Sequence, residues 1–192
     1  MRTAVLISGR GSNMSALVEA ARSCDFAAEI VLVLSDAPAA PGLAVARKAG
    51  VAAEAIDFKA YPGRAAFERA LEARLRAERA QIVCLAGFMR VLSPAFVEGW
   101  KGRILNIHPS LLPELRGLNT HERALRQGLP EHGCTVHFVT AELDAGPIIA
   151  QARVPVLPDD DAEALAARVL KEEHRLYPAA LNEVARSLGA AE

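Results

Sequence analysis

The sequence has few cysteines, no long apolar run and almost no net charge. Its three cysteines, Cys24, Cys84 and Cys134, are widely spaced, form no CxxC pair and follow no secretory signal, so we expect a cytoplasmic protein without a disulfide framework. Apolar runs such as residues 30–34 are far shorter than the roughly 20 residues that span a bilayer, which argues against a membrane protein. The formal net charge of -1 argues against nucleic acid as a partner, but it leaves room for a small pocket that binds an anion.

What the sequence does contain is the composition of one globular domain. Of its 192 residues, 52% are hydrophobic and 23% are charged, and a chain of this length buries enough surface to fold without a structural metal. Short β-branched runs alternate with stretches of helical period, which predicts an α/β fold with a Rossmann-like open sheet. We expect about seven strands, mainly parallel with an antiparallel pair at the end, and helices on both faces.

The strands are predicted at residues 3–7, 29–34, 53–56, 81–85, 104–108, 134–139 and 148–156. Helices are predicted after Asn13, at residues 42–49 and 65–79, from Ser93, briefly near Thr120, and from about residue 161, where Pro178 should interrupt or kink the helix. Residues 110–133 contain three glycines and two prolines around that one short helix, and we expect a long loop of the kind that contacts substrates.

A glycine-rich turn joins the first strand to the first helix. Such a turn directs backbone N–H groups and the positive end of the helix at one point, so residues 9–13 form a candidate anion site. A dinucleotide fingerprint would need a third glycine where Met14 stands, although Asp36 at the end of the second strand favours a ribose contact. The simpler explanation is that Gly9 and Gly11 only permit a tight turn.

The run from Asn106 to Pro113 follows a buried strand and is more specific. The two-residue period of a strand places Asn106 and His108 on the same side, with Ile107 on the opposite, core side. Ligands bind at the carboxyl ends of strands in open α/β sheets, and an amide and an imidazole there can both donate hydrogen bonds to a developing oxyanion. A structural, hydrogen-bonded histidine is the alternative.

Asp144 lies in a turn between the last two predicted strands, where a local Asx turn would explain it. If the turn approaches His108, the carboxylate favours the charged imidazolium form and makes that histidine an acid catalyst. The other candidates are weaker. His121, His132 and His137 match no metal-ligand spacing and are interpreted as surface or loop residues, and no serine or cysteine has a context that activates it as a nucleophile.

Several ordered motifs extend over nearly the whole chain: Ser8-Gly9-Arg10-Gly11-Ser12-Asn13, Phe88-Met89-Arg90, residues 106–113, residues 135–139, Asp144-x-Gly146-Pro147 and Glu173-His174-x-x-Tyr177-Pro178. By these motifs the chain resembles the glycinamide ribonucleotide transformylases, which are folate-dependent formyltransferases of purine (IMP) biosynthesis. The resemblance implies one formyltransferase domain over residues 1–192, with phosphate binding in the N-terminal half and folate binding and catalysis in the C-terminal half.

The resemblance also implies the reaction and the roles of its residues. The formyl group of 10-formyltetrahydrofolate passes directly to the amine of 5'-phosphoribosylglycinamide, with no metal and no covalent enzyme intermediate. Asn106 and charged His108 would hold the oxyanion, and Asp144 would keep His108 charged and help a water molecule to move protons.

Binding residues are implied in the same way. The phosphate is assigned to Gly11, Ser12 and Asn13, and the glycinamide amine to Glu173. The folate is assigned to Arg64, Met89, Arg90, Val91, Leu92, Asn106, Thr140, Ala141, Glu142, Leu143 and Asp144, with Arg64 and Arg90 near its anionic tail. Without the family, Met89, Val91 and Leu92 would be interpreted as ordinary core, and Arg64 and Glu173 as solvated helix charges.

One segment departs from the family pattern, because Glu114-Leu115-Arg116 follows Pro113 where relatives often carry a basic or small residue and then an aromatic one. We therefore expect the contacts that this loop makes to differ from those of the relatives. Formyltetrahydrofolate hydrolases and methionyl-tRNA formyltransferases share the catalytic motifs but normally add a further domain. A nucleotide-binding module without activity is another alternative, although it would be expected to lose His108 or Asp144. We expect small-molecule partners and a monomer or homodimer.

Overall fold

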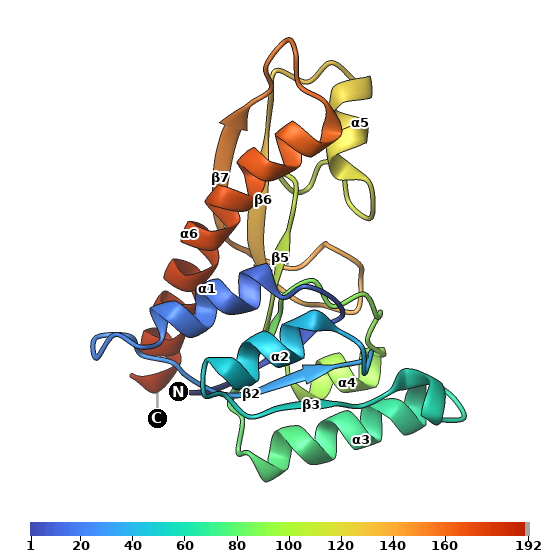
Figure 1. Ribbon diagram of the computed structural model, residues 1–192, viewed down its shortest axis with the longest axis vertical. Coiled ribbons are helices and arrows are strands. Elements are labelled where there is room, and N and C mark those ends of the chain that lie inside the picture. Colours follow the sequence, from blue (N-terminus) through green and yellow to red (C-terminus); the bar gives the residue numbers. More distant parts are fainter. Residues whose placement is uncertain (191–192) are drawn as a thin grey trace.

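The apolar runs of the sequence form strands, and the amphipathic segments between them form helices. The computed structural model describes residues 1–190 (Figure 1). The strands are β1 (Arg2–Ile7), β2 (Glu29–Ser35), β3 (Ala53–Ala55), β4 (Ile82–Leu85), β5 (Ile104–His108), β6 (Glu131–Phe138) and β7 (Ile148–Pro155). The helices are α1 (Ser12–Ala20), α2 (Pro41–Lys48), α3 (Arg64–Ala77), α4 (Pro94–Gly99), α5 (Thr120–Arg126) and α6 (Ala162–Gly189), with a short 3-10 helix, η1 (Phe58–Ala60).

The strands form one seven-stranded sheet in the order β3-β2-β1-β4-β5-β6-β7. The strands from β1 to β5 pair in parallel, whereas β6 is antiparallel to β5 and β7 is antiparallel to β6. The predicted α/β class, the mixed sheet and the antiparallel end are therefore confirmed. Because β1 and β4 are neighbours while β2 lies beyond β1, the chain reverses its direction across the sheet there, and such a point is where α/β sheets bind ligands.

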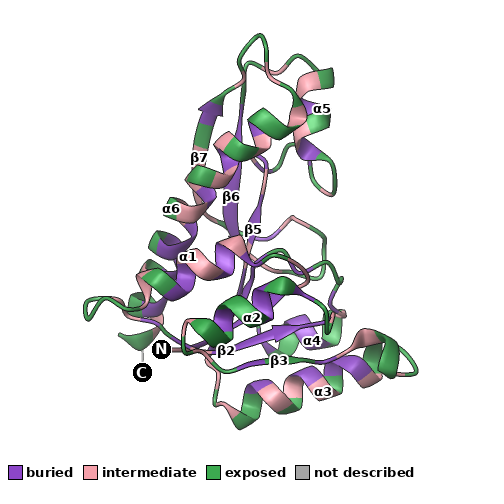
Figure 2. Cartoon of the chain, in the orientation of Figure 1, coloured by how far each residue is buried: buried purple, intermediate pink, exposed green. Residues whose placement is uncertain are grey.

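The central strands β1, β2, β4 and β5 are mostly buried on both faces, which explains why they are apolar at consecutive positions (Figure 2). One core cluster joins one face of the sheet to α1, α2, α5 and α6, and its side chains include Leu17, Leu43 and Tyr177. The second cluster joins the other face to α3 and α4, and it includes Phe67, Leu71 and Trp100. Each helix thus turns its apolar stripe toward the sheet, as the sequence period predicts.

Two details differ from the sequence prediction. Strand β6 begins at Glu131, three residues before the predicted start, because the segment around His132 and Gly133 pairs with β7 in spite of the glycine. Helix α6 continues through Pro178 without interruption. The predicted interruption is therefore wrong. It was expected from the missing proline N–H, but packing of Tyr177, Leu181 and Val184 in the core offsets that loss.

The interpretation of three histidines as surface or loop residues was wrong for two of them. His132 and His137 lie on β6 and are 1% and 2% exposed, and His121 on α5 is partly buried with its ring edge against the ring of His132. Within residues 1–190, none of the helices combines the length and the apolar character that crossing a membrane requires.

The burial of His132 predicts a loss of stability in acid. Burial, reinforced by His121 and His108, lowers the pKa of His132 to about 4, whereas a histidine in the unfolded chain titrates near 6.5. Between these values the unfolded state binds more protons, so stability falls as the pH is lowered through this window. Urea unfolding at about pH 7.5 and about pH 5 should show that His132→Gln reduces this loss by about 1–2 kcal/mol. An equal loss in both proteins would contradict the assignment.

Candidate active site

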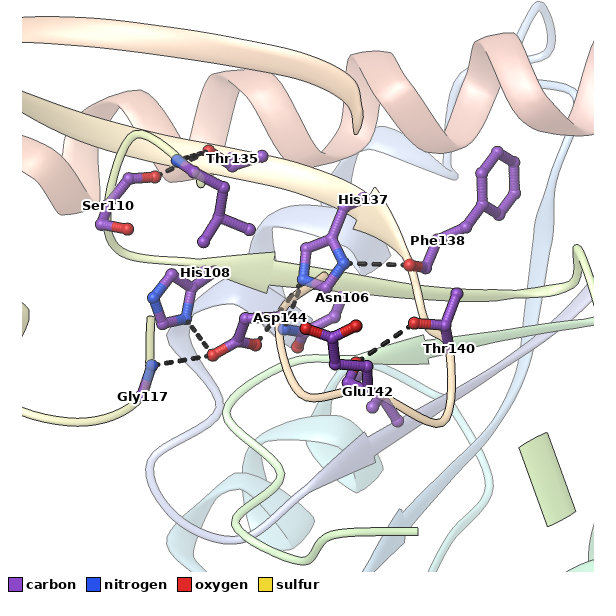
Figure 3. Close-up of polar contacts among 12 residues, drawn as sticks. Asn106, His108, Ser110, Gly117, Thr135, His137, Phe138, Thr140, Glu142 and Asp144 are labelled. Atoms are coloured by element: carbon purple, nitrogen blue, oxygen red, sulfur yellow. Dashed lines mark hydrogen bonds and ion pairs between the residues drawn. The ribbon is translucent and has the colours of Figure 1, made fainter. Parts of the chain in front are cut away.

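The two polar side chains at the end of β5 lie where the strand period predicts. His108 is buried, Asn106 is partly buried, and Ile107 between them is in the core. The antiparallel register of β5 and β6 sets Asn106 opposite His137 and His108 opposite Thr135. The end of β5 is therefore bordered by a second strand that adds another imidazole to the site (Figure 3).

The turn between β6 and β7 brings Asp144 back to this strand end. Its Oδ2 atom lies 3.4 Å from Nδ1 of His108 and accepts a hydrogen bond of 3.0 Å from the backbone N–H of Gly117 (Figure 3). The turn is tight because a Cβ at Gly146 would lie 1.8 Å from the carbonyl oxygen of Phe138, and Asp144 itself has a φ of 49°. The turn therefore approaches His108, as an acid–histidine pair requires. The local sequence around Asp144 indicated only an Asx turn.

Both ring nitrogens of His108 face hydrogen-bond acceptors. Nδ1 faces the carboxylate of Asp144, and Nε2 lies 3.0 Å from the backbone carbonyl oxygen of Leu115. Because a carbonyl oxygen can only accept, Nε2 carries a hydrogen, and Nδ1 lies at ion-pair distance from the carboxylate. The loop that departs from the family pattern therefore contacts His108 directly, and its Arg116 also pairs with Glu142 at 2.6 Å.

His137 is a site residue that the sequence analysis missed. Its Nδ1 lies 3.0 Å from the carbonyl oxygen of Phe138, which can only accept, so this nitrogen carries the hydrogen. Burial lowers the pKa of His137, which favours the neutral ring, although the Phe138 carbonyl and the Asp144 charge act in the opposite direction. Its Nε2 is then an acceptor for the Asn106 Nδ2 group, 3.1 Å away, and this contact orients the amide. The available signal was the strand alternation, which places residues 135 and 137 on the same side of β6.

A cavity of about 460 Å³ opens beside these groups. It gathers most of the binding residues that the resemblance implied: Asn13, Met89, Arg90, Val91, Leu92, Asn106, His108, Thr140, Ala141, Glu142, Leu143, Asp144 and Glu173. Gly11 and Ser12 precede Asn13 but do not line it, and Arg64 lines a separate cavity of about 220 Å³ beside it. Met89 and Val91 are 65% and 60% exposed, so they form a wall of the opening and are not core residues.

The opposite side of the cavity carries a buried carboxylate. Glu173 on α6 is 7% exposed and accepts a hydrogen bond of 2.6 Å from Nδ2 of Asn13, so it is not a solvated helix charge. Burial raises the pKa of Glu173, and the bond from Asn13 opposes that effect. The Oδ1 atom of Asn13 is buried without a hydrogen-bond partner among residues 1–190. Both groups have capacity for a ligand that donates hydrogen bonds.

The glycine turn has the form of an anion site. Gly11 precedes α1 with a φ of 74°, a conformation that favours glycine, and a Cβ there would lie 2.9 Å from the Met14 side chain and 3.2 Å from the backbone of Gly42. The first backbone N–H groups of α1 have no partner within the helix and point out of its N-terminus. Among the described residues, no group of three or more histidine, cysteine or acidic side chains is arranged to hold a metal ion.

Comparisons with known proteins agree with this geometry. A family model described as formyl transferase matches residues 1–181. The phosphoribosylglycinamide formyltransferase of Escherichia coli (strain K12) is 47% identical over 178 residues, which are 93% of this chain and 84% of that protein. The trifunctional purine biosynthetic protein adenosine-3 of Bos taurus is 50% identical over 184 residues, and the chain spans 18% of the length of that protein.

Solved structures show the same architecture. The crystal structure of phosphoribosylglycinamide formyltransferase from Brucella melitensis is 55% identical, with a TM-score of 0.93 over 96% of this chain and 95% of that one. The crystal structure of glycinamide ribonucleotide transformylase 1 from Symbiobacterium toebii is 48% identical, with a TM-score of 0.95 over 97% of this chain and 88% of that one. The family model covers most of the chain, and the Escherichia coli relative matches over most of its own length. The chain therefore belongs to the formyl transferase family.

Proposed function

We propose that this chain transfers the formyl group of 10-formyltetrahydrofolate to the primary amine of 5'-phosphoribosylglycinamide. The single observation that carries the proposal is the convergence of Asn106, His108 and Asp144 on one cavity, although Asp144 is distant from the other two in sequence. The names of two relatives specify formyl transfer to phosphoribosylglycinamide, and the name of a third specifies purine biosynthesis.

The residues present fit a folate as co-substrate. The wall from Met89 to Leu92 supplies apolar surface for a flat ring, and the segment from Thr140 to Asp144 on the facing side supplies backbone donors and acceptors for the polar edge of a pterin. When bound, the folate supplies the activated formyl group, and the protein contributes the position and charge of its own residues.

The acceptor fits the other end of the cavity. A phosphate would bind at the N-terminus of α1, where Gly11, Ser12 and Asn13 present backbone N–H groups. The glycinamide amine would donate a hydrogen bond to Glu173, whose carboxylate lies beside Asn13 at the cavity wall. This arrangement would direct the amine toward the end of β5.

Asn106 and His108 would stabilise the negative charge that develops on the formyl oxygen. One hydrogen of the Asn106 Nδ2 group faces His137, which leaves the second hydrogen for that oxygen. His108 contributes the positive charge of an imidazolium. A direct hydrogen bond from His108 to the oxygen requires its Nε2–H group to turn from, or to be shared with, the Leu115 carbonyl.

Asp144 would hold His108 in its charged form and serve the proton transfer. Attack by the amine forms the new C–N bond, and departure of the folate nitrogen breaks the old one. One proton must therefore move from the attacking nitrogen to the leaving nitrogen. The Asp144 carboxylate, fixed by the Gly117 N–H group, can orient a water molecule that carries this proton.

An assay of formyl transfer tests the proposal directly. The chain should formylate phosphoribosylglycinamide in preference to water and to aminoacylated tRNA, the acceptors of the two related enzyme classes. In a thermal shift experiment, phosphoribosylglycinamide and a folate analogue should each raise the melting temperature. Stabilisation by NAD alone, without formyl transfer, would instead indicate a nucleotide-binding module.

Replacement of the oxyanion donors should lower turnover. Asn106→Ala and His108→Ala should each reduce kcat by about 10²-fold or more, because each removes a donor or a charge that acts mainly in the transition state. Steady-state kinetics and circular dichroism would separate this loss from misfolding. Near-normal turnover of a folded variant would exclude the role for that residue.

The raised pKa of Glu173 predicts a pH-dependent affinity for the acceptor. Because burial raises this pKa, the carboxylate becomes protonated at a higher pH than an ordinary glutamate, and the neutral group lacks the negative charge and is a weaker acceptor for the amine. The KM for phosphoribosylglycinamide should therefore increase as the pH falls, and Glu173→Gln should raise that KM at neutral pH and flatten its dependence on pH. If the variant retained the acid limb of kcat/KM for this substrate, another group would be responsible.

A further inference from the structure

Asp36 is a buried carboxylate that the proposed chemistry does not use. It follows β2, and its side chain is only 3% exposed. Its Oδ2 accepts a hydrogen bond of 2.6 Å from Nε of Arg90, and its Oδ1 has no hydrogen-bond partner among residues 1–190. Because Arg90 covers the carboxylate, Asp36 is not available for the ribose contact that its place in the sequence suggested. A buried carboxylate needs a cation beside it, which ties Arg90 to this position.

Arg90 is held from a second side by an aromatic ring. Its guanidinium carbon lies 4.2 Å from the centre of the Phe58 ring, and Phe58 in turn packs edge-to-face on Phe67 at 5.2 Å. The backbone N–H of Phe58 donates to the backbone carbonyl of Asp36. Asp36 therefore binds Arg90 directly and also anchors the ring on which the guanidinium rests.

The remaining donors of Arg90 are unused by the described part of the chain. With Nε on Asp36, the terminal amino groups Nη1 and Nη2 make no hydrogen bond within residues 1–190, and the side chain is 40% exposed. A guanidinium held at Nε and on one face keeps its two terminal groups pre-organised for an acceptor in a fixed direction.

Arg90 stands at the border of two cavities. The larger one contains the proposed reaction centre, and the smaller one shares its wall from Met89 to Leu92. The smaller cavity also has Arg64 in its lining, whereas the carboxylate of Glu68 there is bonded to the backbone N–H and the hydroxyl of Ser93. The Glu68 oxygens are thus occupied by Ser93, while Arg64 and the terminal amino groups of Arg90 are the donors left in this lining for an anionic group.

The resemblance already assigns Arg90 to the anionic tail of the folate. We propose that Asp36 is the positioning residue for that contact, because it fixes the Arg90 guanidinium so that the terminal amino groups face the carboxylate-bearing end of the co-substrate. The inference rests on the proposed function, which places the flat ring of a folate in the larger cavity. A folate is elongated, with the ring at one end and carboxylates at the other, so its anionic end extends along the shared wall into the smaller cavity. The negative charge of Asp36 by itself repels a ligand carboxylate. Asp36 therefore assists binding through the fixed acceptor oxygen that it offers to Nε of Arg90.

The test compares two formyl donors that differ only in the anionic end. In Asp36→Ala, the KM for 10-formyltetrahydrofolate should rise by about 5- to 20-fold, as expected for the loss of one well-oriented charge-assisted contact. The kcat and the KM for phosphoribosylglycinamide should stay within about twofold. With 10-formyltetrahydropteroate, which lacks the glutamate, the KM should change by less than about twofold. Asp36→Asn keeps an acceptor oxygen for Nε and should restore most of the affinity.

Matched variants separate positioning from a general structural effect. Glu54→Ala breaks another carboxylate–arginine pair of the same half of the sheet, with Arg74 at 2.7 Å, and should change neither donor's KM. Asp36→Ala combined with Arg90→Ala should be no weaker than Arg90→Ala alone, because Asp36 acts through Arg90.

An equal rise of KM for both formyl donors in Asp36→Ala would overturn the inference, because it would indicate a changed shape of the 89–92 wall. Failure of Asp36→Asn to restore the KM would overturn it too, because the effect would then come from the charge of Asp36. A wild-type chain that transfers no formyl group would refute the proposed function instead. Calorimetric titration with tetrahydrofolate and tetrahydropteroate gives the same comparison without turnover, so the two failures are distinguishable.

Discussion

The contact between the His108 ring and the Asp144 carboxylate is the constraint on which the rest of the site depends. Both side chains are less than one-tenth exposed, and a carboxylate at this depth requires several donors around it. The Gly117 N–H group donates to this carboxylate and the His108 ring lies beside it at ion-pair distance, while the Leu115 carbonyl accepts from the Nε2–H group of the same ring. Strand β5, the segment from 115 to 117 and the turn before β7 must therefore all be in place before the site exists.

The fold and half of this site could be predicted from the sequence because they follow from local periods. Consecutive apolar residues in the first strands indicated a sheet covered on both faces, and the alternation around Ile107 placed Asn106 and His108 together. The approach of Asp144 could not be predicted in this way. Its local sequence indicates only a turn, and its partner is set by the pairing of β5, β6 and β7.

The polar residues that local patterns alone would leave at the surface share one physical reason for their burial. His132, His137 and Glu173 are polar side chains for which exposure is the ordinary expectation, and only tertiary structure supplies the partners that make their burial possible. For His137 those partners are the Phe138 carbonyl and the Asn106 amide, and for Glu173 the partner is Asn13, far away in the chain. Pro178 illustrates the converse, because packing of α6 outweighed a strong local signal against a continuous helix.

The lining of the larger cavity bears on the order in which the substrates bind and the products form. Within residues 1–190, its lining includes no cysteine, serine or lysine that could carry an acyl group between two half-reactions. If the transfer is direct, as the resemblance implies, donor and acceptor must occupy the cavity at the same time, one against the 89–92 wall and the other against Glu173. The steady-state kinetics of a direct transfer are sequential. Both substrates bind in a ternary complex before either product forms.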